Sequence, residues 1–259
     1  MSDNLIPALV IPSISVFLCL LIGVRLGEKT YPDAADGRAW WHYRLWWLLT
    51  AAGALVGLLA IALLALGVNN LWLHLFLSTG GSIFVLVALW GLLSYLLYVY
   101  SGRHRLGTVL AVMYAAMILS VLYITFWLGP VSVRLDAWGT AINFENTLAP
   151  NVLLIYSLSL ALLLGLPPFL AAAGFFVLSL RVKEHSPKLR ARVVSLGLMF
   201  LFGVAYILPV LFLPFNIQTD TPLWQFGTRL LGQLALLAIY WAYFPPVFLQ
   251  KAFKIDPLV

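Results

Sequence analysis

The chain has 259 residues, of which 63% are hydrophobic and only 9% are charged, and its mean hydropathy is +1.01. This composition excludes a water-soluble globule and predicts an integral membrane protein that forms a single domain over residues 1–259. The net charge of +6 does not indicate a nucleic-acid partner, because the basic residues lie at the ends of apolar runs, where lipid headgroups are nearer.

The first apolar run, residues 5–26, begins without basic residues, and its first positive charge, Arg25, comes at its end. A cleavable signal peptide has the reverse order, so we expect a spanning helix that stays in the protein, with its N-terminus outside. A polar segment follows and ends in WWHYRLWW, residues 40–47, which we interpret as an aromatic belt at the membrane interface. The second helix is expected over residues 45–67.

An uncharged turn, GVNN, leads to a third helix, expected over residues 71–100. This run is longer than the roughly 20 residues that a crossing needs, which predicts a tilted or protruding helix. A fourth helix, residues 106–128, ends at Gly129 and Pro130, because proline cannot continue the helical hydrogen bonding. The segment after it is the longest outer loop, and it either lies on the membrane surface or forms a lid over a pocket.

The fifth apolar run, residues 150–180, contains Gly165, Pro167 and Pro168 well inside the span. Two consecutive prolines remove two amide donors and clash with the preceding turn, so the helix must kink or break there. Pro209 interrupts the next apolar run in the same way. These four residues are candidate hinge residues; the alternative is that the prolines are tolerated, as they are in many spanning helices.

Two further helices, residues 193–213 and 223–249, bring the number of crossings to seven. All but two of the fifteen Lys and Arg residues, Arg134 and Arg229, then lie on one side. Because cytoplasmic loops carry the excess positive charge, the sequence predicts an all-α integral membrane protein, a seven-transmembrane-helix bundle with its N-terminus outside and its C-terminus in the cytoplasm. The absence of an Asn-x-Ser/Thr sequon favours the inner membrane of a prokaryotic cell.

The turn between the fifth and sixth helices holds more basic residues than any other. It anchors the orientation of the bundle and offers contacts to anionic lipid or to a cytoplasmic partner protein. These candidate contacts are Arg181, Lys183, Lys188, Arg190 and Arg192.

All nine acidic residues lie in predicted tails or loops, and no Lys or Arg lies near the middle of a span. Pumps, ion-coupled carriers and voltage sensors use ionisable groups inside the membrane, so the sequence argues against these classes. Motifs of hydrolases and nucleotide-binding enzymes are also missing, so we expect no enzyme, no catalytic residue and no cofactor. His42, His104 and His185 fall near the inner boundary, and we interpret them, like His74, as separate interfacial histidines rather than a metal or haem site.

Uncharged polar residues remain inside the predicted spans. They either hold the helices together by hydrogen bonds or line an outward-facing cavity for a weakly polar or lipid-like ligand. The candidate cavity residues are Ser78, Thr79, Tyr123, Asn151, Tyr156, Tyr206 and Gln233.

Three classes of function remain. Seven helices, an outer N-terminus, late kinks and a basic inner turn favour a receptor or sensor that signals to a separate cytoplasmic partner; in layout alone this looks like seven-helix receptors and the membrane sensor halves of some bacterial kinases. The alternatives are a non-catalytic subunit or assembly factor of a larger membrane complex, such as an energy-transducing one, and a facilitative carrier for a small neutral solute. The expected partners are membrane lipids and proteins in the membrane or cytoplasm.

Overall fold

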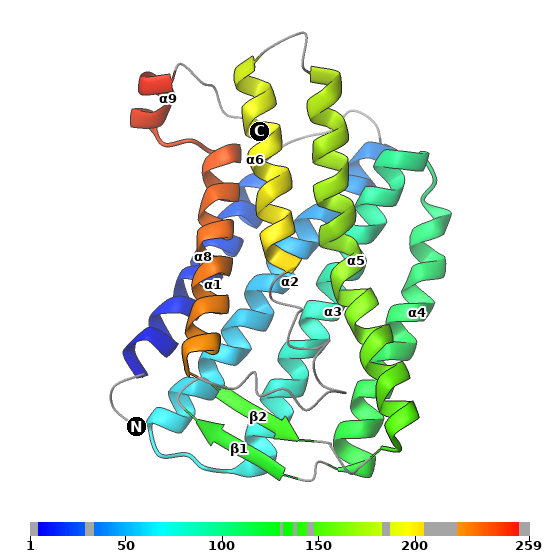
Figure 1. Cartoon of the computed structure of the whole chain (residues 1–259), viewed down its shortest axis with the longest axis vertical. Coiled ribbons are helices and arrows are strands. Elements are labelled where there is room, and N and C mark those ends of the chain that lie inside the picture. Colours follow the sequence, from blue (N-terminus) through cyan, green and yellow to red (C-terminus); the bar gives the residue numbers. More distant parts are fainter. Residues whose placement is uncertain are drawn as a thin grey trace.

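The computed structural model describes residues 5–28, 34–129, 132–136, 139–143, 148–182, 187–204 and 222–253, and most of them are helical (Figure 1). The first helices along the chain are α1 (Leu5–Gly27), α2 (Ala34–Ala65), α3 (Leu71–Ser101), α4 (Arg105–Leu122), which continues into the π-helix η1 (Tyr123–Leu128), and α5 (Pro150–Val182). They are followed by α6 (Pro187–Val204), α8 (Pro222–Tyr243) and α9 (Val247–Phe253). Five of these helices, α1 to α5, are long and apolar enough to cross a membrane, which supports a multi-pass integral membrane protein.

The helix boundaries agree with the sequence predictions for α1, α3, α5 and the α4–η1 segment, and they differ for three other helices. α6 begins at Pro187 rather than at residue 193, because proline suits the first position of a helix and the basic segment after it is helical. α2 begins at Ala34 rather than at residue 45, so the polar segment before the apolar run is part of the helix. The negative charge of Asp36 in the first turn stabilises this start, because the N-terminal end of a helix carries partial positive charge. α8 ends at Tyr243, and Pro245 and Pro246 separate it from α9, because neither proline can donate the amide bond that would continue the helix.

Residues 205–221, which hold the end of the sixth predicted span and the segment before the seventh, lie outside the described part of the chain. Two of the candidate site residues, Pro209 and Tyr206, fall in this segment. The five crossings above are supported by length and composition, whereas a total of seven stays a prediction.

The segment that we expected to form an outer loop contains a β-hairpin. β1 (Ser132–Asp136) pairs antiparallel with β2 (Gly139–Asn143), so that Ser132 lies opposite Asn143 and Asp136 opposite Gly139. Outside the apolar layer the backbone amides still need hydrogen-bond partners, and the pairing of the two strands supplies them locally, between Ser132 and Asn143. In Figure 1 the hairpin lies across the end of the bundle where α2 is joined to α3.

The helices form a closed arrangement. α2 packs against α1 and α3, and α3 packs against α4 and α5; the second half continues from α5 through α6 to α8, which returns to α1. The turn from α3 to α4, the end of α5 and α9 lie at one end of the bundle in Figure 1, opposite the hairpin. The elements at this end carry exposed basic side chains, and we call it the basic end; among the described residues its exposed cations are Arg25, Arg38, Arg103, Arg105, Arg181 and Lys251.

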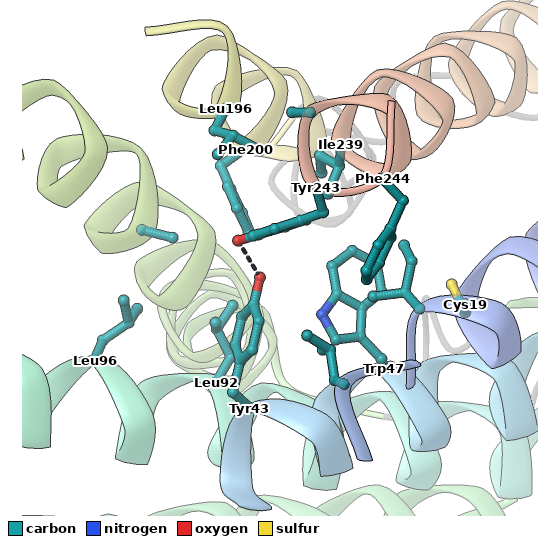
Figure 2. Close-up of a cluster of buried hydrophobic side chains, with 14 of the residues drawn as sticks. Cys19, Tyr43, Trp47, Leu92, Leu96, Leu196, Phe200, Ile239, Tyr243 and Phe244 are labelled. Carbon is teal, nitrogen blue, oxygen red and sulfur yellow. Dashed lines mark hydrogen bonds between the residues drawn. The ribbon is translucent and has the colours of Figure 1, made fainter. Parts of the chain in front are cut away.

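The core near the basic end is aromatic (Figure 2). Tyr43 and Trp47 are only 2% and 0% exposed, whereas Trp41 is 49% exposed. Tyr43 and Trp47 therefore belong to the core rather than to the predicted interfacial belt, whereas the other residues of the 40–47 stretch are half-buried or, like Trp41, exposed. Residues three and four apart lie on one face of a helix, and the face that carries Trp40, Tyr43 and Trp47 is directed into the bundle. The other buried members of this cluster come from α1, α2, α3, α5, α6 and α8, and they include Cys19, Ile22, Leu26, Leu92, Leu96, Leu196, Phe200, Ile239 and Phe244.

Candidate functional site

The consecutive prolines bend α5 without ending it. The helix is continuous from Pro150 to Val182 and changes direction near its middle in Figure 1, so the predicted kink is present and the predicted break is not. Pro167 has no amide hydrogen, and Leu163 O, four residues earlier, therefore loses its helical donor. The buried Tyr114 hydroxyl of α4 donates to this oxygen at 2.6 Å. A neighbouring helix thus supplies the hydrogen bond that the proline removes.

A second tyrosine binds α5 on the other side of the prolines. The Tyr100 hydroxyl of α3 donates to Leu170 O at 2.8 Å. Gly174 makes this approach possible, because a Cβ atom at this position would overlap the Tyr100 hydroxyl. The α5 backbone is therefore held by two hydrogen bonds from different helices.

The hinge candidates Gly165, Pro167 and Pro168 all lie between Leu163 and Leu170, the two residues at which α5 is held. The bend has a defined shape in this state, since α3 and α4 each fix one side of it. Any change in the bend must break or move one of these tyrosine hydrogen bonds. The sequence contains Tyr114, but the sequence alone did not pair it with the carbonyl that Pro167 leaves free.

The second proline pair, at the end of α8, is supported in the same way. Pro246 removes the helical donor for Ala242 O, and the guanidinium of Arg192 in α6 donates to this oxygen. Gln250 of α9 folds back, so that its side-chain amide donates to Pro245 O at 2.6 Å and its backbone amide donates to Pro246 O at 3.0 Å. Arg192, a predicted contact for a cytoplasmic partner, is instead half-buried and bound to α8.

Side chains of α2 bind the end of α1. Trp40 Nε1 donates to Leu26 O at 3.1 Å, and Arg44 Nε donates to Gly23 O at 2.9 Å. The Arg44 guanidinium also lies over the Trp41 ring, 5.6 Å from its centroid. The last carbonyls of a helix lack amide partners and carry partial negative charge, so an indole N–H and a guanidinium are suitable donors there.

A buried hydrogen bond joins α2 to α8 inside the aromatic cluster. The hydroxyl oxygens of Tyr43 and Tyr243 lie 2.7 Å apart, as Figure 2 shows. The Tyr43 ring also contacts Tyr95, with 4.7 Å between centroids. Next to Tyr243, the buried Phe244 ring lies beneath the guanidinium of Arg25, 5.3 Å from the centroid. Polar contacts therefore connect α1, α2, α6 and α8 at the basic end, although 200 residues separate the two tyrosines in sequence.

The candidate cavity residues differ in their surroundings. Gln233 is buried, and its side-chain amide donates to the Ser15 hydroxyl of α1, while its Oε1 is buried and has no hydrogen-bond partner among the described residues. This bond joins α1 to α8, as the alternative of polar residues holding helices together predicts. Of the others, Thr79 is buried, Ser78 and Tyr156 are half-buried, and Tyr123 and Asn151 are exposed. A shared cavity stays a prediction.

The basic turn after α5 is described only in part. Arg181 is exposed and Arg190 is half-buried. The side chains of Lys183 and Lys188 lie outside what the structure describes. Arg181 is thus the member of this group whose side chain is shown to be exposed, and its contact with lipid or a partner stays a prediction.

The described histidines each contact a different side chain or carbonyl. His42 packs edge-on against Trp90, with 5.4 Å between centroids, and His104 stacks on Tyr98 at 4.1 Å. Trp90 and Tyr98 are eight residues apart on α3, about 12 Å along the helix, so these two histidines do not converge. His185 lies outside the described residues, within which no three His, Cys, Asp or Glu residues are placed to hold a metal. His74 is buried, not interfacial, and its Nε2 bonds to Val68 O at 2.7 Å.

No protein-family model matches the chain, and no curated protein is significantly similar to it. The most specific polar arrangement in the described part of the chain is the set of contacts at the basic end, together with the two supported proline pairs.

Proposed function

We propose that this chain is a receptor or sensor without enzymatic activity. In this proposal seven helices cross the inner membrane of a prokaryotic cell, with the N-terminus outside, and a change of helix packing at the basic end is passed to a separate cytoplasmic protein. The positive residues at that end support the orientation, because positive charge is retained on the cytoplasmic side.

The observation that carries the proposal is the buried Tyr43–Tyr243 hydrogen bond. It joins α2 to α8, the last long helix of the cluster, at the point where the chain leaves the bundle through Pro245 and Pro246. A signalling bundle needs two packing states of similar free energy, and a single hydrogen bond between helices is a contact of suitable size. In membranes such bonds contribute about 0.6 kcal/mol on average and up to about 1.7 kcal/mol.

The rest of the geometry fits the same mechanism. An outer signal that straightens or deepens the bend of α5 moves α6, which packs against it. α6 holds the end of α8 through Arg192 and Ala242 O, so its displacement acts directly on the segment that leads to α9. The Tyr43–Tyr243 pair resists this displacement, because it fixes α8 to α2.

The test compares backbone amide exchange in the full-length protein in lipid nanodiscs for the wild type, Tyr43→Phe, Tyr243→Phe and the control Tyr240→Phe. Tyr240 is half-buried one turn earlier on α8 and is not part of the pair. Both pair variants should raise exchange at the α8–α9 junction by about threefold to about twentyfold, the range that corresponds to the loss of one such bond. The control should leave the exchange unchanged. If amide exchange at the α8–α9 junction is the same in the pair variants as in the control, the Tyr43–Tyr243 bond does not control the packing of α8, and the proposal fails.

The same proteins separate this proposal from the two alternatives. If the chain is a receptor, its affinity for the cytoplasmic protein should differ between the pair variants and the wild type, in either direction. A complex subunit co-purifies with equimolar partners in every variant. A carrier raises solute flux in liposomes that contain only this chain.

A further inference from the structure

We propose that α9 lies flat on the anionic headgroup layer at the basic end of the bundle, with Val247 and Phe248 inserted among the upper acyl chains and Lys251 bound to lipid phosphates. This surface contact is separate from receptor function and does not depend on it. The occupant of the α9 face is thus a lipid surface.

The depth of α9 follows from its neighbour Phe244. This residue is buried at the end of α8, and the Arg25 guanidinium lies over its ring. Arg25 is the first positive charge after the apolar run of α1, so it marks the level at which that helix leaves the acyl layer. α9 begins three residues after Phe244 and therefore starts at the level of the headgroups.

The orientation of α9 is set by Gln250. Its side-chain amide donates to Pro245 O, so the face of the short helix that carries Gln250 is directed toward the proline pair, while its backbone amide donates to Pro246 O as a helical bond of α9. Figure 1 shows α9 displaced to the side of the bundle rather than continuing α8 upward. The helix is therefore placed beside the bundle, over the area that lipid occupies.

The exposed face of α9 has the chemistry of an interfacial helix. Val247 and Phe248 are 62% and 63% exposed, and Lys251, one turn later, is exposed on the same side. Apolar side chains next to a lysine match an interface in which acyl chains lie below anionic phosphates. Arg25 and Arg181, which are exposed at the same end of the bundle, favour anionic lipid there.

The test places an environment-sensitive fluorophore on a Val247→Cys variant of the full chain in nanodiscs of neutral or mixed neutral and anionic lipid. Cys19 is buried, and the chain with Cys19 alone gives the labelling background. We expect blue-shifted emission in anionic nanodiscs, quenched by lipids that carry a spin label just below the headgroup. A label on Ser101→Cys, at the exposed α3–α4 turn, should emit as in water.

Two further substitutions in the labelled protein test the chemistry. Lys251→Gln should lower the ratio of inserted to water-exposed label about fivefold in anionic nanodiscs only, the effect of one basic residue near such a surface. Phe248→Ser should lower it in both lipid mixtures. Water-like emission in every lipid would overturn the proposal, and so would blue-shifted emission that lipid quenchers do not reach, because α9 would then be covered by protein. Neither substitution touches the buried core, so folding is retained as judged by the tryptophan emission of the bundle.

Discussion

Replacing Tyr114 with phenylalanine isolates the hydrogen bond that α4 gives to the bend of α5. The substitution keeps the buried ring and removes only the hydroxyl that lies 2.6 Å from Leu163 O. That oxygen has lost its helical donor to Pro167, so the variant leaves a buried carbonyl unsatisfied. An unsatisfied buried group costs about 1–3 kcal/mol, and measured bonds between membrane helices reach about 1.7 kcal/mol. We expect a loss of about 1–2 kcal/mol in the free energy of unfolding.

The explanation is tested by repeating the substitution in a Pro167→Ala background. Alanine restores an amide hydrogen four residues after Leu163, so the carbonyl regains a donor within its own helix. In this background Tyr114→Phe should lower the free energy of unfolding much less than it does in the wild type. The coupling free energy from this double-mutant cycle should be about 1 kcal/mol. This exceeds the scatter of about 0.3–0.5 kcal/mol expected for independent sites.

The assay is reversible unfolding of the purified protein in mixed micelles, followed by tryptophan fluorescence and helical circular dichroism. Tyr123→Phe is the matched control, because Tyr123 is exposed near the end of the same helical segment. It should change the free energy of unfolding by less than about 0.5 kcal/mol. An equal cost of Tyr114→Phe with and without Pro167 would refute the idea that Tyr114 replaces the missing proline donor.

Three other substitutions follow from close contacts. Gly174→Ala should destabilise the protein by about 1–3 kcal/mol, because its Cβ displaces the Tyr100 hydroxyl, and the penalty should shrink in a Tyr100→Phe background. Gly91→Ala should lower the free energy of unfolding by a similar amount, because its Cβ would lie 2.9 Å from His42 O of α2. Gly57→Ala is the control, because its Cβ meets nothing within 4 Å, and it should leave the stability unchanged. Equal melting temperatures for the two variants would contradict this prediction. Arg44→Met should cost about 1–2 kcal/mol and speed amide exchange at the end of α1, and unchanged exchange there would show that Arg44 is not needed as a cap.

The spacing of apolar runs and prolines was sufficient to predict the helices up to residue 182, because each one must cover the width of a membrane. The start of α2 was missed, because polar residues can continue a helix outside the membrane, where water solvates their side chains. Two residues of the aromatic stretch 40–47, Tyr43 and Trp47, were misassigned for a different reason. Aromatic rings suit both an interface and a core, and only the packing of distant helices, such as α8 on α2, decides between them.

The hydrogen bonds that matter most in the candidate site were also beyond local sequence patterns. The free carbonyl at Leu163 follows from Pro167 alone, but the identity of its donor depends on how α4 lies against α5. Arg192 appeared in the sequence as one of five basic residues of a turn, and only the packing of α6 against α8 separates its role from that of Arg181.

The contact between Tyr114 and Leu163 also has a consequence for biogenesis. A lone α5 released from the translocon would expose the Leu163 carbonyl to hydrocarbon without a donor, at a cost of several kcal/mol. An α4–α5 hairpin removes that cost, because the donor arrives on the preceding helix. The two helices should therefore leave the translocon as a pair, and truncation after α5 should insert more completely than a fusion that carries α5 without α4.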